Sequence, residues 1–155
     1  MFEGKSVEKK QSFGTRLGYS YSPVTFLPIL VVAKKDILVT GFSVMSFAAT
    51  TATIEVYKLK EAGSFVGEEH NPDAWTLIGS TTIDTLDNRP TPLPPGTISD
   101  VAIRSGATQS FYVTFHSDTN YNRYSRASTY GEVNAENSDL QFKVVSCHCL
   151  VLWIV

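Results

Sequence analysis

Residues 109–116, which read QSFYVTFH, alternate between apolar and polar-tipped side chains without a break. Consecutive side chains of an extended strand point to opposite faces of a sheet, so this segment would present two different faces. One face is apolar and carries Phe111, Val113 and Phe115. The other carries Tyr112, Thr114 and His116. The alternation predicts a half-buried β-strand, because an amphipathic helix would instead repeat its apolar residues about every 3.6 positions.

Other segments predict further short strands. Residues 53–58 alternate cleanly, with Ile54 and Val56 directed inward and Glu55 and Lys58 toward solvent or the rim. Additional strands are expected from β-branched and aromatic content between turn residues. They cover residues 75–83, 98–103, 121–124, 131–134 and 140–142. No segment has the pattern of an amphipathic helix of useful length.

Two segments depart from simple alternation. In residues 36–44 the apolar set shifts by one position after Val39, and a bulge at Gly41 would restore a single apolar face. Residues 19–32 are apolar and aromatic but contain Pro23 and Pro28. Because proline cannot donate to a strand ladder, this segment is expected to be an edge segment that runs into a strand.

Seven or eight short strands separated by Gly, Pro, Asn and Asp loops predict an all-β fold. The specific expectation is a two-sheet antiparallel β-sandwich, jelly-roll-like. The 155 residues fit one domain, and 43% apolar residues are enough to fill its core. A second domain would leave neither half with enough core.

The sequence divides into three parts. Residues 1–18 are polar and unpatterned and are interpreted as a loose N-terminal arm, and residues 19–143 as the β-sandwich domain. Residues 144–155, VVSCHCLVLWIV, form an almost uninterrupted apolar tail. This tail is either a buried final strand or, as we favour because it does not alternate, a segment foreign to the domain. Its two cysteines lie two positions apart, a spacing that would strain a disulfide, so free thiols are expected.

Several classes of function lack support in the sequence. The net charge is −2 with both signs interspersed, so nothing would neutralise a run of phosphates and no nucleic-acid partner is expected. No segment has the length of a membrane-spanning helix or the apolar stretch of a signal peptide. Ser43 lies in GFSVM, which lacks the final Gly of a nucleophile elbow, and no two histidines have metal-ligand spacing. We therefore expect no enzyme activity and no cofactor.

Aromatic and polar residues concentrate between residues 112 and 130 and suggest a ligand site. The candidate ligand-binding residues are Tyr112, Tyr121, Arg123 and Tyr124. Tyrosine offers a flat apolar ring and a hydroxyl, the combination that a sugar-binding surface requires. The alternative is a set of ordinary exposed tyrosines on a β-rich surface.

Two other motifs invite a functional interpretation. Glu68, Glu69 and Asp73 cluster in one loop and could hold Ca²⁺ through carboxylate oxygens, although a solvated acidic loop is the simpler alternative. Residues 89–95, RPTPLPP, fit the polyproline pattern that SH3 domains read. A proline-rich connection between strands produces the same string, and we favour that structural interpretation.

Several short motifs together resemble an uncharacterised β-sandwich domain that recurs, often in tandem, in predicted surface proteins of algae and marine microbes. The resemblance covers roughly residues 15–142 and rests on Lys35-Asp36-Ile37 to Gly41-Phe42, Ile54-Glu55-Val56-Tyr57, Gly63-Ser64-Phe65-Val66-Gly67, Ala74-Trp75-Thr76, Pro90-Thr91-Pro92, Gln109 to Thr114, Arg123-Tyr124, Gly131-Glu132-Val133 and Asp139-Leu140. A fainter similarity links Asp36-Ile37 and the following Gly41 to the jelly-roll PHR domains of some ubiquitin-ligase proteins.

The resemblance implies a jelly roll with a role in adhesion or partner binding at the cell surface or outside the cell, and it transfers no active site. Similar domains usually continue beyond the position of Phe142 with a further segment of the domain, whereas this sequence changes there to the apolar run VVSCHCLVLWIV. Similar proteins also tend to carry export signals, and none is expected in this sequence. Both differences would follow if the chain were a fragment of a longer gene product.

The function expected from the sequence is a non-catalytic binding or adhesion module, whose end loops contact a glycan or a protein. The alternative is a structural jelly-roll subunit of a virion or surface layer, which self-association would favour. The sequence leaves the ligand, the compartment and the oligomeric state open.

Overall fold

The computed structural model describes residues 24–46, 48–87, 89–117, 124–125, 133–143, 149–150 and 153–154. In this part of the chain the fold is all-β, and every pair of named strands is antiparallel. The one helical element among these residues is a short 3-10 turn, η1, at Pro72–Ala74. No helix within the described ranges is long and apolar enough to cross a membrane.

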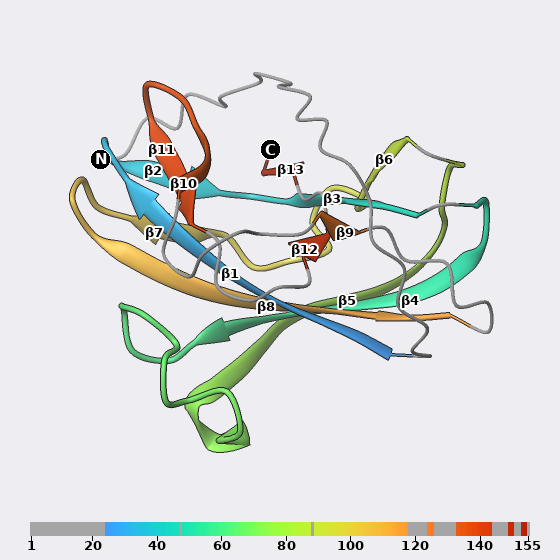
Figure 1. The fold of residues 1–155 in the computed structure, drawn as a ribbon, viewed down its shortest axis with the longest axis horizontal. Coiled ribbons are helices and arrows are strands. Elements are labelled where there is room, and N and C mark those ends of the chain that lie inside the picture. Colours follow the sequence, from blue (N-terminus) through green and yellow to red (C-terminus); the bar gives the residue numbers. More distant parts are fainter. Residues whose placement is uncertain are drawn as a thin grey trace.

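A six-stranded sheet, here called the main sheet, forms the larger part of the molecule (Figure 1). Its strands lie in the order β10-β11-β1-β8-β4-β5. Their bounds are Val133–Glu136 for β10, Leu140–Lys143 for β11, Val24–Ala33 for β1, Thr108–His116 for β8, Thr51–Leu59 for β4 and Trp75–Asp84 for β5. The expected strands 53–58, 75–83 and 109–116 are therefore confirmed with small extensions.

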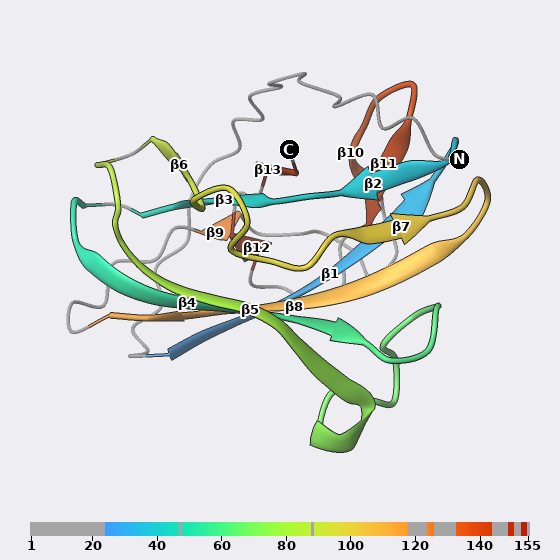
Figure 2. The same ribbon diagram turned by 180° about the vertical axis from the view of Figure 1, so that it is seen from behind.

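Three smaller sheets accompany the main sheet. One pairs β2 (Ile37–Val39) with β7 (Val101–Ile103), and another joins β13 (Trp153–Ile154), β3 (Phe42–Met45) and β6 (Pro90–Pro92). The third pairs β9 (Tyr124–Ser125) with β12 (Cys149–Leu150). Strands β2, β3, β6 and β7 lie on the same side of the main sheet in both opposite views (Figures 1 and 2).

The main sheet shares one hydrophobic core with strands β2, β3 and β7 of the smaller sheets. The fully buried residues of the main sheet that contribute to it are Val31, Ile54, Val56, Phe111, Val113 and Phe115. The smaller sheets contribute Val39, Phe42 and Val44, which are also fully buried, together with Val101 and Ile103. The rings of Phe42 and Phe111 meet edge to face with centroids 5.3 Å apart, so the two sets of strands are in direct contact.

The segment 36–44 forms two strands instead of one bulged strand. Strand β2 ends at Val39 and pairs with β7, whereas β3 begins at Phe42 and pairs with β6. The break at Thr40 and Gly41 has the effect that was expected of a bulge, because Val39, Phe42 and Val44 are all fully buried on the core side. The change of partner strand is what the sequence did not reveal.

Strand β1 has β8 on one side, but it lies between two described strands only near its end, so the expectation of an edge segment that runs into a strand is wrong only for that end. It pairs with β8 from Val24 to Val32. On its other side, β11 pairs only with the stretch from Leu30 to Ala33. Pro28 precedes the stretch that is paired on both sides. Its missing N–H therefore interrupts no described ladder between β1 and β11.

The proline-rich segment has a structural role, although three of its residues form the short strand β6 and not only a connection between strands. Thr91 is buried, and its hydroxyl accepts a 2.8 Å hydrogen bond from the amide of Leu86. The amide of Leu93 donates to the carbonyl of Phe42 at 2.8 Å, so the chain stays attached to β3 just beyond β6. A segment held in this way does not present a free polyproline helix.

Two short pieces of the apolar tail pair with strands of the domain. Strand β12 pairs with β9, and β13 pairs with Phe42 and Ser43 of β3. The rest of the tail, and the N-terminal arm predicted for residues 1–18, lie outside the described residues.

Candidate functional site

The face of the main sheet that points away from the core is called the outer face here. Register places its side chains in rows, because Tyr57 of β4 lies opposite Tyr112 of β8, and Glu55 lies opposite Thr114. In the next row of the same two strands, His116 lies opposite Thr53. The outer face therefore combines aromatic, acidic, hydroxyl and imidazole groups at the centre of the sheet.

Glu55 is the centre of a small hydrogen-bond network on this face. Its Oε2 atom accepts from the Tyr57 hydroxyl at 2.9 Å and from the Thr114 hydroxyl at 3.3 Å. The Nε2 atom of His116 lies 3.6 Å from the same oxygen and 3.1 Å from Thr114 Oγ1. Since the one proton of Thr114 goes to Glu55, the contact with His116 requires that Nε2 carries a proton and donates.

Thr114, His116 and Glu55 contain the group types of a catalytic triad but not its geometry. A relay uses the two different imidazole nitrogens, one toward the nucleophile and one toward the carboxylate. Here both contacts run to Nε2 of His116. Thr114 is also only 3% exposed, so a substrate carbonyl could not reach its hydroxyl. The network holds side chains in place and does not activate a nucleophile.

Both tyrosines of the outer face are protonated at neutral pH. Partial burial is the main cause that raises the pKa of Tyr57, followed by its hydrogen bond to the Glu55 carboxylate and the negative charge of that group. Burial alone raises the pKa of Tyr112. Each phenol therefore keeps its O–H donor while the ring offers an apolar surface.

An aromatic cluster continues the face toward one end of the sheet. The rings of Trp75 and Tyr112 have centroids 5.3 Å apart, and Phe65 lies 6.4 Å beyond Trp75. Leu77, which lies opposite Tyr57 on β5, is 50% exposed. This end of the face therefore offers half-buried rings beside an exposed aliphatic side chain.

The loop of residues 60–74 covers the end of the face next to this cluster. Figure 1 shows the loop after β4 on the side of the main sheet away from β2 and β3. Phe65 is buried there and packs with Leu30 and Leu59. The Ser110 hydroxyl donates to the carbonyl of Gly63 at 2.7 Å, which ties the loop to β8. Such contacts make the loop a fixed wall of the face.

Hydroxyl groups dominate the opposite end of the face. Thr53 and Thr82 share a hydrogen bond of 2.9 Å between neighbouring strands. In the next row, the Thr51 hydroxyl donates to Asp84 at 2.6 Å. The outer face thus changes from aromatic to hydroxylic along the strands, with Glu55 between the two ends.

Of the four predicted ligand-binding residues, Tyr112 lies on this face. Tyr121 and Arg123 lie outside the described residues, and for Tyr124 the structure describes only the backbone pairing with Leu150. Glu55 and Tyr57 were not among the site residues predicted from the sequence. The alternation of residues 53–58 already assigned Glu55 to the face away from the core. The register that places Glu55 and Tyr57 beside β8 depends on tertiary contacts and could not be predicted from this local pattern.

The three carboxylates proposed for calcium have separate surroundings. Glu68 accepts a 2.7 Å hydrogen bond from the side-chain amide of Asn71. Glu69 accepts from the amide of Gly67 at 2.7 Å, while Asp73 is exposed in η1. Across the described part of the chain, no three His, Cys, Asp or Glu side chains gather as a metal ion would require. Glu68 and Glu69 therefore stabilise turns of the loop through these hydrogen bonds.

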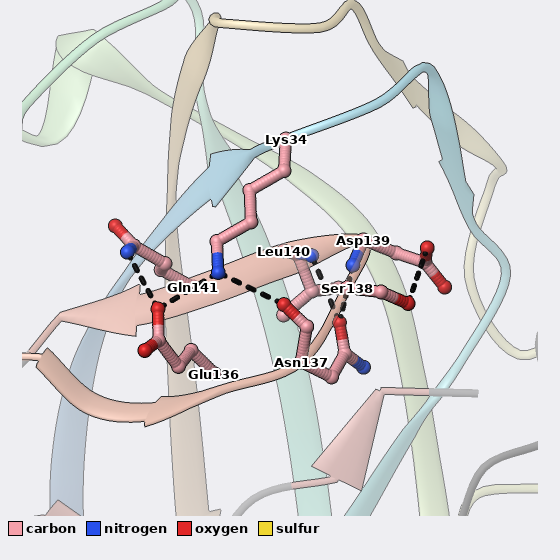
Figure 3. A network of polar contacts seen from close by, with 7 residues as sticks. All are labelled: Lys34, Glu136, Asn137, Ser138, Asp139, Leu140 and Gln141. Atoms are coloured by element: carbon pink, nitrogen blue, oxygen red, sulfur yellow. Dashed lines mark hydrogen bonds and ion pairs between the residues drawn. The ribbon is translucent and has the colours of Figure 1, made fainter.

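A second polar network lies where the β10–β11 hairpin meets the end of β1 (Figure 3). The Lys34 ammonium donates to Glu136 at 2.8 Å and to the carbonyl of Asn137 at 2.9 Å. The Asn137 side chain accepts from the amides of Asp139 and Leu140, which closes the turn. Hydrogen bonds from Lys34 and Gln141, and the charge of Lys34, lower the pKa of Glu136. Because Lys34 directly follows β1 and its partners belong to the hairpin, the network attaches the hairpin to the end of β1.

A comparison of the chain with protein-family models finds no match, and a search of curated proteins finds none either.

Proposed function

We propose that the two sets of strands form a two-layer β-sandwich of jelly-roll type. The support is the shared core, in which residues of the main sheet and of β2, β3 and β7 are buried against each other. A sandwich needs two apolar faces pressed together, each backed by an outward face with polar residues. The main sheet has this division, since its buried core residues alternate along β4 and β8 with half-buried outer residues such as Tyr57 and Tyr112.

We further propose that the domain is a non-catalytic module that binds carbohydrate on the outer face of the main sheet. The observation that carries the proposal is the placement of Tyr57 and Tyr112 opposite each other, next to the carboxylate of Glu55. A tyrosine ring can stack on the apolar face of a sugar, while hydroxyl and carboxylate groups beside it accept and donate hydrogen bonds. Trp75 extends the stacking surface beyond Tyr112.

The rigid placement of the two tyrosines also favours the binding of a glycan. Both tyrosines are on central strands, and the Tyr57 hydroxyl is already fixed by Glu55. A site on regular strands loses little conformational entropy when a ligand binds, which leaves more of the contact energy as affinity. The proposed contact surface therefore lies on the sheet itself and not on the end loops, which the sequence had suggested.

The test is glycan-array binding by the purified chain and by variants of the two tyrosines. Tyr112→Ala and Tyr57→Ala remove a ring and should abolish binding, whereas Tyr112→Phe keeps the ring and should weaken it only partly. Leu38→Ala is the control, because Leu38 is 44% exposed on β2, on the other side of the core. Binding that survives both alanine variants would contradict the proposal.

Size-exclusion chromatography separates this function from the structural-subunit alternative. A module that binds glycans through one face is expected to elute as a small species. Elution as a large closed assembly, with no glycan bound on the array, would favour the structural subunit.

A further inference from the structure

The charges of the outer face restrict the glycans that it could accept. Across β8, β4 and β5 the described residues of this face include the carboxylates Glu55 and Asp84 and no Lys or Arg. Lys58 of β4 lies opposite the core residue Phe111 and therefore belongs to the other face, not to the side of Glu55 where the sequence placed it. On the outer face itself, the nearest described ammonium group by register is Lys143 of β11, opposite Leu30 at the end covered by the loop. The covering loop adds four carboxylates and one lysine within residues 60–74. The face is therefore acidic at its centre and along its wall.

The two oxygens of Glu55 differ in what they contact. Oε2 takes the contacts with Tyr57, Thr114 and His116. Oε1 makes no hydrogen bond to any residue within the described ranges, and the Glu55 side chain is 31% exposed. An ionised carboxylate oxygen only accepts hydrogen bonds, so a group that binds there must donate one. A sugar hydroxyl can do so, but a uronate or sulfate oxygen cannot.

Resting on the proposed function, we infer that this face selects neutral glycans over uronic or sulfated ones and that Glu55 is the residue that sets this specificity. A neutral chain places hydroxyl donors at Glu55 Oε1 while its apolar faces stack on Tyr57 and Tyr112. A uronate of the same linkage brings a second negative charge to the same place. Repulsion between like charges about 4 Å apart in water corresponds to roughly a fivefold loss of affinity.

The experiment compares matched hexamers that differ only at the C6 group: mannose with mannuronate, galactose with galacturonate, and glucose with glucuronate. Affinities are measured by isothermal titration calorimetry at low salt, where interactions between charges are least screened. Glu55→Gln removes one negative charge but keeps an amide oxygen that can accept from Tyr57 and Thr114. Asp100→Asn makes the same charge change next to β7, which pairs with β2 and not with the main sheet.

The expected result is that, in at least one pair, the neutral hexamer binds roughly fivefold more tightly than the uronate. In Glu55→Gln this ratio should fall toward one, and in Asp100→Asn it should stay unchanged. A smaller ratio, a preference for the uronate, or an unchanged ratio in Glu55→Gln overturns the inference about specificity. If no hexamer of any pair binds, the proposed carbohydrate function itself fails, which is a different outcome from binding without charge selection.

Discussion

The hydroxyl of Thr114 donates to the carboxylate of Glu55 on the neighbouring strand at 3.3 Å, and Thr114 is only 3% exposed although it lies on the outer face. A hydroxyl that is shielded from water must find its partner within the protein. The contact therefore joins β8 to β4 through their side chains in addition to the backbone ladder.

Thr114→Val tests this contact. The change preserves shape but leaves Glu55 and His116 without their shared partner, so we expect a loss of about 1 kcal/mol in the free energy of unfolding. Urea denaturation measures it. Thr82→Val is the matched control, because the Thr53–Thr82 pair is exposed and its loss should stay within about 0.5 kcal/mol. Equal effects of the two substitutions would contradict the role of Thr114.

Gly79→Ala should destabilise the edge of the main sheet. Gly79 of β5 forms an isolated bridge with Ile98, and an added Cβ would lie 2.2 Å from the carbonyl oxygen of Thr97. The segment at Ile98 would have to move away, at a cost of roughly 1–3 kcal/mol. It would also uncover part of the β5 edge, which favours aggregation between chains.

Thermal unfolding and light scattering together measure both effects of Gly79→Ala. Ser80→Ala, at the exposed neighbouring position on the same strand, is the control and should change neither. A Gly79→Ala protein with an unchanged melting temperature would show that the bridge at Ile98 is not needed.

Phe42 and Phe111 should be energetically coupled if the smaller sheets pack on the main sheet as a second layer. Both rings are fully buried, and they meet edge to face at 5.3 Å. Each single substitution to Ala should cost roughly 3–5 kcal/mol. A double-mutant cycle with Leu at both positions keeps the chain folded and should give a coupling of about 0.5–1.5 kcal/mol. Strict additivity in urea denaturation would contradict the direct contact.

Stability should decrease at alkaline pH because of the outer-face tyrosines. The pKa values of Tyr57 and Tyr112 are raised in the folded state, so folding favours their protonated forms. Their contribution is fully present below the unfolded pKa of about 10 and is lost as the pH rises through the higher folded values. Ultraviolet titration of the phenols, together with urea denaturation across this range, measures the effect.

Tyr57→Phe and Tyr112→Phe should each make the loss of stability at high pH smaller, since neither residue can then ionise. The effect is modest because both side chains are partly exposed to solvent. An unchanged alkaline profile in both variants would mean that other groups control it.

The all-β class and the inward and outward faces of individual strands follow from local patterns in the amino-acid sequence. Alternation in residues 109–116 correctly assigned Phe111, Val113 and Phe115 to the core, and residues 53–58 did the same for Ile54 and Val56. Period-two patterns are local, so they can be read without knowledge of the partner strand.

Which strands become neighbours does not follow from local patterns, because register and strand order depend on contacts between residues far apart in the chain. The tertiary structure was needed to establish both. It placed Tyr57 beside Tyr112 and Glu55 beside Thr114, pairs that 55 and 59 positions separate. It also changed the partner of the chain at Gly41, and it added β11 as a second neighbour to the end of β1. The candidate site exists only through these pairings, whereas its single residues had each been assigned to a strand from the sequence.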